Sequence, residues 1–424
     1  MPSPLSVTAL AGTAELGGAE RVLLDFANRA FEHDIALRVI TPMDGPLVGI
    51  LNKIGVPAEV LPASPALVRG FRRERWYLPR PMFGLYRWTG DLARHRWIAD
   101  ADVVYSVAFR THLAARLGRL SPIVWHLHRF PPQPGRRYWL SAARSGPAGL
   151  IANSEIVARA WRPALSDDPD GRRLHVIHNG VNLDRFRPRE PTGWIHDRLG
   201  LPRNHRLIGM PALFARWKGH LEVLRAFERI AGEFPDVHLV IVGGSTYQTD
   251  AEHRYGQQLK RVTGEFRVVT AETVETMERT EPRERSEALE ASRSHPRVHM
   301  LPFQREIELA FPEFDLTVHY SVRPEPFGRV VLESMACGIP VIAAAEAGPL
   351  EILGTESGAH REAGWLARPR DPGALASVLR TALATPAAER RAMGAAGRMR
   401  AEDHFSSRTF AGRVADVLRD AAGA

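Results

Sequence analysis

The sequence Arg323-Pro-Glu-Pro-Phe-Gly-Arg-Val-Val-Leu-Glu333 separates two carboxylates, Glu325 and Glu333, by a proline-containing turn and a short apolar run. Pro326 favours the start of a helix, and Phe327 and Gly328 would then present free backbone N–H groups. Together with the positive end of the helix dipole, these groups form an anion site that suits a diphosphate. The stretch therefore predicts a diphosphate site at a loop that leads into a helix.

The two carboxylates have different surroundings and therefore different predicted roles. Glu333 falls in the second turn of the predicted helix, where a carboxylate can accept two hydrogen bonds from a vicinal diol such as a ribose. Glu325 lies before the helix and faces the group on the far side of the diphosphate. The alternative makes Glu333 a surface carboxylate and Glu325 a helix cap, but it leaves the intervening Pro-Phe-Gly unexplained.

Two cations upstream are candidates for the same site. Arg216 and Lys218 come just after the first predicted strand of the second half and open a helix. At the carboxyl end of a strand, such cations can neutralise the charge that develops on a leaving diphosphate. Ordinary surface charge is the alternative interpretation of both.

Short apolar runs alternate with amphipathic stretches along both halves of the chain, which is typical of doubly wound parallel sheets. In the first half we predict strands at residues 5–10, 36–40, 58–61, 102–105, 123–128, 150–152 and 175–177. In the second half we predict strands at 207–210, 238–242, 298–301, 316–319 and 341–344, and helices at 221–231 and 330–337. The pattern predicts an α/β protein with two Rossmann-like lobes facing across a cleft.

The length of the chain sets the expected number of domains. A single hydrophobic core rarely grows beyond ~250–300 residues, so a chain of 424 residues is expected to form two lobes. We place the lobes at 1–185 and 205–404, joined by a linker at 186–204, with a C-terminal helix at 405–424 that can cross back to the first lobe. An insertion at 245–296, rich in Glu and Arg, is expected to be an exposed helix or partly disordered.

Composition and charge exclude several classes of protein. The 56 Lys and Arg against 48 Asp and Glu give a net charge of +8, which suits anionic partners, but no nucleic-acid-binding signature occurs and we expect none bound. The single cysteine excludes an intrachain disulfide and a zinc site built on cysteine pairs. Because neither a secretory signal nor a run of ~18 apolar residues occurs, we expect a cytoplasmic protein, at most peripheral at the inner face of the membrane.

The first half offers further candidates. Gly17 and Gly18 precede a predicted helix, so that the backbone can approach a phosphate or a sugar closely. His126 and His128 end a predicted strand and, with a period of two, share one of its faces. Ligands bind at the carboxyl ends of strands in doubly wound lobes, so a histidine here is a candidate substrate contact. A purely structural role is the alternative.

The segment 69–97 departs from the α/β rhythm, since it interleaves eight arginines with seven aromatic residues. Guanidinium groups meet lipid phosphates and aromatic rings sit at the level of the headgroups, so an anionic membrane surface is one expected partner. Pro79 and Pro81 break any single amphipathic helix. A loop that packs the lobes together and a wall of a substrate site are the alternatives.

Taken in order, these segments resemble family 4 of the retaining glycosyltransferases, which have the GT-B fold. The resemblance covers nearly the whole chain. Its matching residues are 17–20, 151–154, 176–188, 218–219, 242–243, 324–341 and 348–351. The Glu-Pro-Phe-Gly block with its second glutamate and the Asn-Gly-Val segment at 179–181 are specific together.

The resemblance implies transfer of a sugar from a nucleotide-diphosphate donor to an acceptor hydroxyl, with retention at the anomeric carbon and no metal or other cofactor. The lobe at 1–185 would bind the acceptor, and the lobe at 205–404 would bind the nucleotide sugar. The acceptor would be a glycan, a lipid-linked molecule or a small molecule. The product would belong to cell-surface polysaccharide, glycolipid or related glycoconjugate synthesis.

The resemblance also assigns roles to residues. Glu325 would hold hydroxyls of the donor sugar, and His128 matches the family's first-lobe histidine near the reacting sugar; these two are the implied catalytic residues. Lys218 would bind the diphosphate and Glu333 the ribose. The full set of implied substrate-binding residues is Gly17, Gly18, Arg216, Lys218, Phe327, Gly328, Arg329, Val330 and Glu333.

Two positions depart from the family pattern. In the family, an arginine that binds the diphosphate usually lies about five residues before the lysine. Here that position is occupied by Leu213, and Arg216 is the candidate for the same role. The acidic residue that often follows the first-lobe histidine is replaced by Arg129. Neither departure removes the predicted donor site.

We expect the acceptor hydroxyl to attack from the face that the diphosphate leaves, with the departing phosphate helping to take the proton. Lobe closure would exclude water from the reaction. Two alternatives are a GT-B sugar-nucleotide epimerase and a non-catalytic scaffold that binds nucleotide or membrane. The Glu-Pro-Phe-Gly block argues against the epimerase, and the presence of Glu325, Lys218 and Glu333 argues against the scaffold.

Overall fold

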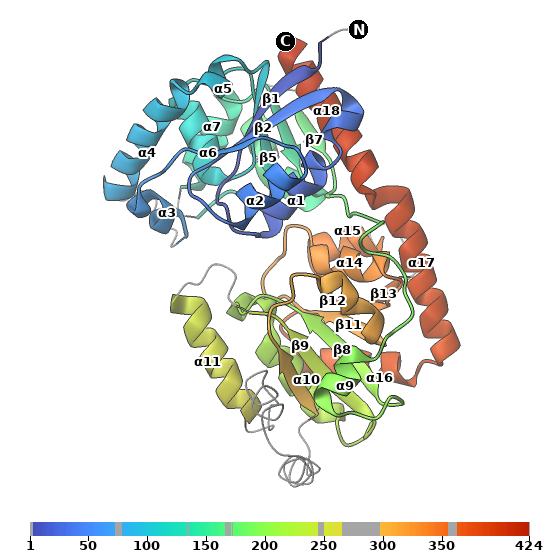
Figure 1. Ribbon diagram of the computed structural model, residues 1–424. Coiled ribbons are helices and arrows are strands. Elements are labelled where there is room, and N and C mark those ends of the chain that lie inside the picture. Colours follow the sequence, from blue (N-terminus) through green and yellow to red (C-terminus); the bar gives the residue numbers. More distant parts are fainter. Residues whose placement is uncertain are drawn as a thin grey trace. The chain divides into compact units, whose positions relative to one another are not determined.

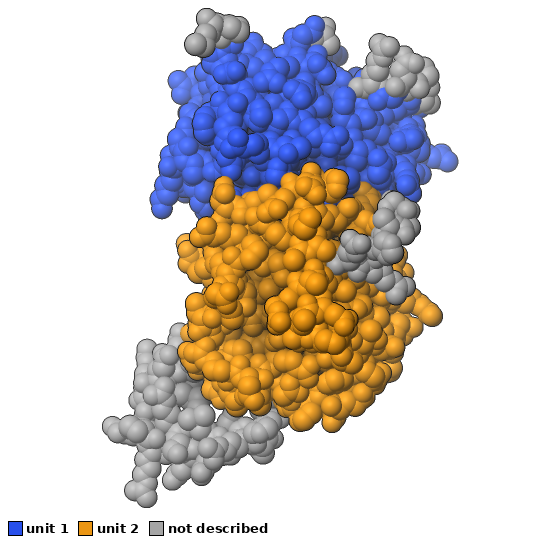
Figure 2. Space-filling view, turned by 90° about the vertical axis from the view of Figure 1, so that its right-hand side faces the viewer, with its two compact units in different colours: residues 1–182, 405–424 blue, residues 183–404 orange. Residues whose placement is uncertain are grey.

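The computed structural model describes residues 3–72, 79–133, 135–165, 171, 173–244, 250–264, 297–354 and 363–423. The chain divides into two compact units, which Figure 2 shows in different colours. Unit 1 comprises residues 1–182 together with 405–424, and unit 2 comprises residues 183–404. The last residues of the chain therefore belong with the first.

Unit 1 is built on a seven-stranded parallel sheet with the strand order β3-β2-β1-β4-β5-β6-β7. Its strands are β1 (Leu5–Leu10), β2 (Ile35–Thr41), β3 (Ala58–Val60), β4 (Val103–Ser106), β5 (Ile123–Leu127), β6 (Gly149–Ala152) and β7 (Leu174–Val176). The strand order reverses between β1 and β4, which are neighbours in the sheet. This reversal is the point at which doubly wound folds bind their ligands.

Helices cover both faces of this sheet, as Figure 1 shows. They are α1 (Gly18–Ala27), α2 (Pro46–Lys53), α3 (Pro65–Arg72), α4 (Pro79–Ala93), α5 (Arg96–Ala99), α6 (Phe109–Leu117), α7 (Arg136–Ser145), α8 (Glu155–Trp161) and α18 (Ser407–Gly423), with 3-10 turns η1 (Ala30–His33) and η2 (Arg162–Leu165). Val7 and Ala9 of β1 pack on the side of α1 and α18, whereas Leu10 packs on the side of α4. Both faces of β1 are therefore buried, which explains its continuous apolar sequence.

Unit 2 has a six-stranded parallel sheet with the order β10-β9-β8-β11-β12-β13. Its strands are β8 (Arg206–Pro211), β9 (Val237–Val242), β10 (Val298–Leu301), β11 (Leu316–His319), β12 (Val341–Ala344) and β13 (Gly364–Ala367). Its helices are α9 (Trp194–Leu199), α10 (His220–Ile230), α11 (Asp250–Gly264), α14 (Arg329–Ala336), α15 (Gly348–Leu353), α16 (Pro372–Ala384) and α17 (Ala387–Phe405), with 3-10 turns η3 (Arg216–Lys218), η4 (Ile307–Leu309) and η5 (Phe311–Glu313). The strand order reverses between β8 and β11.

The α/β class with two doubly wound sheets is confirmed, and every predicted strand is present with its ends shifted by at most one residue. One strand, β13, was not predicted, because four residues that include a glycine carry little periodic signal. The helix predicted at 330–337 is α14, which begins at Arg329, so Pro326 lies before the helix rather than at its start. Gly328 adopts a left-handed backbone conformation, with φ of 107°, and the helix starts after it.

Three predicted segments have a more specific structure. Residues 186–204 contain α9 and lie in unit 2. In the segment 69–97, α4 begins at Pro79 and holds Pro81 in its first turn, where a missing backbone N–H costs nothing. Residues 250–264 of the segment 245–296 form α11, and the rest of that segment lies outside the described residues. Among the helices that the structure describes, none is long and apolar enough to span a lipid bilayer.

Candidate functional site

The loops that follow β8 and β11 meet where the strand order of unit 2 reverses. Gly219 marks the closest approach: its φ is 75°, and a Cβ added there would lie 1.9 Å from the carbonyl oxygen of Tyr320. Only glycine fits such a position, since both the backbone conformation and the contact exclude a side chain. The approach places Lys218, the residue before it, against the loop that carries Glu325.

Glu325 is the centre of a buried network of polar side chains. Lys218 Nζ donates a hydrogen bond to Glu325 Oε1 at 2.8 Å, and His319 Nε2 lies 2.8 Å from Oε2. Ser321 Oγ donates to the same Oε2. The Lys218 and Glu325 side chains are only 10% and 11% exposed, so their charges are largely removed from water and depend on each other for compensation.

The electrostatics of the network keep Glu325 ionised. Burial alone would raise the pKa of Glu325, but electrostatic attraction to His319 and to Lys218, with the hydrogen bonds from both, outweighs burial and holds the pKa well below its ordinary value. An ionised carboxylate only accepts hydrogen bonds, so His319 Nε2 must carry the proton that lies between them. Glu325 is therefore a fixed anion that accepts three hydrogen bonds.

Lys218 has two further neighbours that shape its charge. Its Nζ lies 4.1 Å from the centre of the Trp217 ring, which is within cation–π range. The adjacent His220 is fully buried, and burial together with the charge of Lys218 lowers the pKa of His220 to about 3. His220 is consequently neutral near pH 7 and adds no positive charge beside Lys218.

The helix start at which the anion site is predicted is present in the structure as the beginning of α14. Gly328 is the N-cap of α14, and no side chain caps this end of the helix. The first N–H groups of a helix have no partner within the helix, and the helix dipole is positive there. Phe327 is buried, so the ring packs into unit 2 and the backbone of Gly328, Arg329 and Val330 forms the start of the helix.

Glu333 lies in the second turn of α14, as predicted, and it is 7% exposed rather than on the surface. Arg329 Nε lies 3.3 Å from Glu333 Oε1, an i,i+4 ion pair within α14. Arg216, in contrast, is exposed on η3, two residues before the buried Lys218. The structure thus brings Glu325, Lys218 and the start of α14 together through adjacent loops, and leaves Arg216 at the surface.

The candidates of the first half all lie in unit 1. Gly17 is the N-cap of α1, and a Cβ added at Gly18 would meet no described atom within 4 Å, so the backbone here is open to a ligand. The rings of His126 and His128 lie 3.9 Å apart, as the period of two predicts. His126 is fully buried and bonded to the Tyr105 hydroxyl, and burial followed by the charges of His128 and His112 lowers its pKa. His128 is the partly exposed one of the two.

Sequence reasoning missed two residues of the network, His319 and Ser321. Both follow the pattern that singled out His126 and His128, since they lie at the carboxyl end of β11 with a spacing of two. Applying the same argument to β11 would have found them. No group of three or more His, Cys, Asp or Glu side chains in the described ranges is arranged to hold a metal ion.

Comparisons with known proteins agree with this architecture. The profile of the family described as Glycosyl transferases group 1 matches residues 194–400, and that of Glycosyltransferase Family 4 matches residues 16–185. The D-inositol 3-phosphate glycosyltransferase of Xylanimonas cellulosilytica is 26% identical over 97% of this chain and 93% of its own length. The enzyme of that name from Mycobacterium tuberculosis is also 26% identical, over 84% of this chain and 70% of its own.

Solved structures of similar fold cover nearly the whole chain. The crystal structure of HepE from Anabaena in complex with UDP and glucose superimposes with a TM-score of 0.74 at 22% identity, covering 98% of this chain and 99% of that chain. Sucrose-phosphate synthase from Thermosynechococcus elongatus has a TM-score of 0.70 at 18% identity, with 98% of each chain covered.

Two doubly wound units of this kind define a GT-B glycosyltransferase fold. The two family profiles together match most of the chain, one in each unit. This protein belongs to the group 1 glycosyltransferases.

Proposed function

We propose that the protein is a retaining glycosyltransferase that moves a sugar from a nucleotide-diphosphate sugar to an acceptor hydroxyl. The crystal structures of Anabaena HepE in complex with UDP-glucose and with UDP support a donor of this class. The name of the Xylanimonas and Mycobacterium relatives supports transfer to a hydroxyl of a phosphorylated acceptor.

The observation that carries this proposal is the buried pair of Lys218 and Glu325 beside the uncapped start of α14. A diphosphate at this helix end would meet backbone N–H groups and the Lys218 ammonium, both suited to anionic oxygens. Glu333, one turn into α14, would accept hydrogen bonds from the ribose. Glu325 would face the sugar on the other side of the diphosphate.

The hydrogen bonds already made by Glu325 limit what it can do to the donor. Oε2 accepts from His319 and Ser321, whereas Oε1 accepts from Lys218 alone. A carboxylate oxygen has about two acceptor sites, so Oε1 retains about one. Glu325 would therefore hold a single hydroxyl of the donor sugar rather than a pair.

The three hydrogen bonds that Glu325 accepts also favour the expected same-face mechanism over a mechanism in which a side chain of the enzyme is the nucleophile. A carboxylate with three hydrogen-bond partners and a lowered pKa is a weak base and a weak nucleophile. We propose instead that the acceptor oxygen bonds to the anomeric carbon as the bond to the diphosphate oxygen breaks, and the departing phosphate takes the acceptor proton. Lys218 and the start of α14 would stabilise the charge on the diphosphate, and the scheme invokes no metal ion or other cofactor.

The remaining roles are part of this proposal. His128 would contact the reacting sugar from unit 1, and Gly17 and Gly18 would let the backbone approach substrate there. Arg216 would contribute charge to the diphosphate from the surface of unit 2. The acceptor would be a glycan, a lipid-linked molecule or a small molecule, and the product would serve polysaccharide, glycolipid or related glycoconjugate synthesis. We propose that the enzyme acts in the cytoplasm.

The test is a thermal-shift screen of nucleotide diphosphates and nucleotide sugars, since a ligand that binds only the folded state raises its apparent stability. The donor found in this way is then incubated with acceptors, and the anomeric configuration of the product is read by NMR. Retained configuration is the expected result, and an inverted product would overturn the mechanism. Isomerisation of the donor without any acceptor would instead identify an epimerase.

A further inference from the structure

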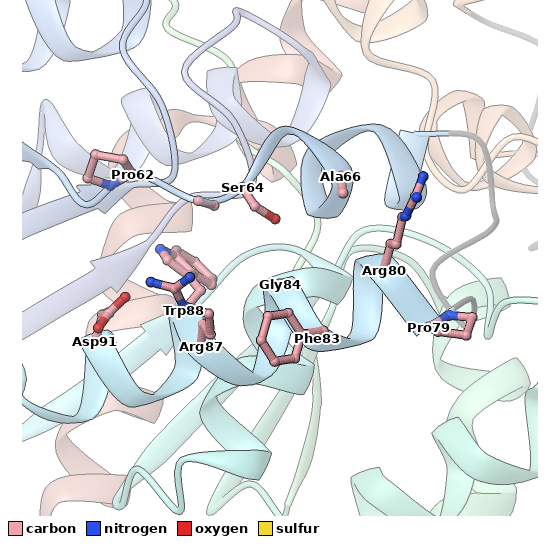
Figure 3. Close-up of a pocket in the computed structure, with 11 residues that line it drawn as sticks. Pro62, Ser64, Ala66, Pro79, Arg80, Phe83, Gly84, Arg87, Trp88 and Asp91 are labelled. Carbon is pink, nitrogen blue, oxygen red and sulfur yellow. The ribbon is translucent and has the colours of Figure 1, made fainter.

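Unit 1 carries a pocket that the proposed transfer does not use. It has a volume of about 690 Å³, within the ~300–1,000 Å³ of ligand-binding clefts. Figure 3 shows that its walls come from the segment after β3, from the start of α3 and from α4. Trp88 of α4 is buried, and its Nε1 donates to the carbonyl oxygen of Leu61 at 2.9 Å, which ties α4 to that segment.

The wall of the pocket between its two ends is mostly carbon. Pro62, Ala63, Ala66 and Phe83 line it without offering a hydrogen-bonding side chain. The Ser64 hydroxyl already accepts a bond from the backbone N–H of Leu67 at 3.3 Å. A sugar needs many hydrogen bonds to its hydroxyls, so this wall suits an apolar chain instead.

The charged residues that line the pocket are two arginines and Asp91, which leave a net positive charge. Figure 3 shows Arg80 at one end and Arg87 at the other, both from α4. Seven positions apart on a helix, they share a face and are about 10 Å apart along the axis. Both are exposed, and neither has an ion-pair partner among the described residues. Asp91, the single acidic residue of α4, lies 3.5 Å from Arg94.

The outer side of α4 also exposes large aromatic rings. Phe83 is 66% exposed and Tyr86 is 74% exposed, whereas Leu85, Trp88 and Leu92 pack into the core of unit 1. The inward side thus fixes α4 in place, and the outward side combines cations with apolar rings. A partner for this side must be both anionic and apolar.

We propose that the outer side of α4 docks on an anionic lipid surface, with Arg80 and Arg87 on lipid phosphates and one lipid chain entering the pocket beside Phe83. Phe83 and Tyr86 would lie at the level of the headgroups, where aromatic rings are favoured, and each arginine would add attraction to the negative surface. This partner goes beyond the proposed transfer, because it involves only unit 1 and none of the donor-site residues.

The charge contribution is tested by co-sedimentation of the full chain with phosphatidylcholine vesicles, with and without phosphatidylglycerol. We expect binding only with phosphatidylglycerol, and about a fivefold loss of affinity for each of Arg80→Gln and Arg87→Gln. Phe83→Ser should also weaken binding. Phe31→Ser and Lys53→Gln are the matched controls. Phe31 is 74% exposed and Lys53 is exposed, and both belong to unit 1 but do not line the pocket. Both variants should bind vesicles as the unchanged protein does.

The pocket itself is tested with a soluble, monomeric short-chain phosphatidylglycerol against glycerol phosphate in calorimetric titrations. The lipid should bind at least tenfold more tightly than glycerol phosphate, and Ala66→Phe, which fills the pocket, should remove that difference. Equal affinity for the two would identify a site for free phosphate and overturn the proposal, as would vesicle binding that survives loss of both arginines. Failure to bind any vesicle would also overturn it and leave an acidic protein surface as the partner of α4.

Circular dichroism and thermal unfolding, measured on the same preparations, show whether each variant is folded. Because Phe83→Ser changes a 66% exposed side chain, it keeps the test decisive if Ala66→Phe does not fold. Loss of vesicle binding with an unchanged unfolding temperature supports the lipid surface whatever the outcome for nucleotide binding or sugar transfer. Absence of transfer activity in the unchanged protein would count against the proposed function alone.

Discussion

Lys218 Nζ and Glu325 Oε1 lie 2.8 Å apart although the two residues are 107 positions apart in the sequence, and both side chains are about nine-tenths buried. A buried pair of this kind is costly to break, because the remaining charge is left without a partner in a poorly solvated place. His319 and Ser321 complete the bonding of the carboxylate from the other side. Both oxygens of the Glu325 carboxylate therefore have partners that fix its orientation in the proposed donor site.

Glu325→Gln keeps the shape of the side chain and removes its charge. We expect kcat for sugar transfer to fall by about 10²–10³, the usual effect of removing one preorganised electrostatic contact. Initial rates with the donor found by thermal shift measure this. Glu346→Gln is the control, because Glu346 forms a surface ion pair with Arg370. Full activity of Glu325→Gln with every donor would show that the assigned role is wrong.

His319 is predicted to position Glu325, and the nature of the replacement should matter. His319→Gln can still donate a hydrogen bond to Glu325 Oε2 and should keep most of the activity. His319→Leu cannot, and kcat should fall by about tenfold or more, as expected for losing a charge-assisted hydrogen bond of ~1.5–3 kcal/mol. Ser321→Ala should cost less, since His319 remains on the same oxygen. Equal loss in His319→Gln and His319→Leu would instead indicate a packing role.

Glu333 is predicted to bind the ribose, and this role can be tested with a nucleotide that lacks one ribose hydroxyl. Glu333→Gln should weaken binding of the donor nucleotide by about tenfold, as loss of a hydrogen bond to a charged group does, with little change in kcat. The unchanged protein should lose a similar factor with the 2′-deoxy nucleotide. Glu333→Gln should discriminate less between the two nucleotides, as calorimetric titration can measure. If Glu333→Gln discriminated between the two nucleotides as strongly as the unchanged protein does, Glu333 would not be the residue that binds the ribose.

His299 of β10 is predicted to make stability depend on pH. Burial lowers the pKa of His299 to about 4, so the folded protein keeps it neutral while the unfolded chain takes up a proton below about pH 6.5. The unfolded state then binds more protons as the pH falls from 6.5 to 4. The free energy of unfolding should decrease over that window, by up to about 3 kcal/mol from this residue.

The measurement is denaturant unfolding of the unchanged protein and of His299→Gln across that pH range. The difference between the two curves isolates His299 from other buried histidines such as His220. His238 Nδ1 lies 2.9 Å from His299 Nε2, and the glutamine amide can replace this contact. Two curves that stay parallel from pH 6.5 to 4 would contradict the prediction.

Gly219→Ala is predicted to destabilise unit 2 more than an ordinary substitution. A φ of 75° costs a residue with a Cβ about 1–2 kcal/mol, and the contact with the Tyr320 carbonyl oxygen adds to that cost. Gly232→Ala is the matched control, because a Cβ there meets no described atom within 4 Å. Chemical unfolding of both variants measures the difference. Equal stability of the two would mean that the loops do not need their close approach.

Local sequence was sufficient for the elements and for several parts of the site. Continuous apolar runs identified the parallel strands, because both faces of each sheet are covered by helices. The proline-containing turn placed Glu333 correctly in the second turn of a helix, because that distance is fixed by the chain itself. The predicted helix at 330–337 matches α14 to within one residue, whereas the left-handed conformation of Gly328 just before it carries no periodic signal in the sequence.

The sequence by itself determined the order of strands and helices, the two doubly wound halves and the residue types at the ends of the strands. Only the tertiary structure decided that β8 lies beside β11 rather than β10, and so brought Lys218 to Glu325 and placed His319 and Ser321 on the same carboxylate. The physical reason is that periodicity reports which face of an element is buried, whereas the neighbour of a parallel strand is chosen by how the connecting helices cover the whole sheet.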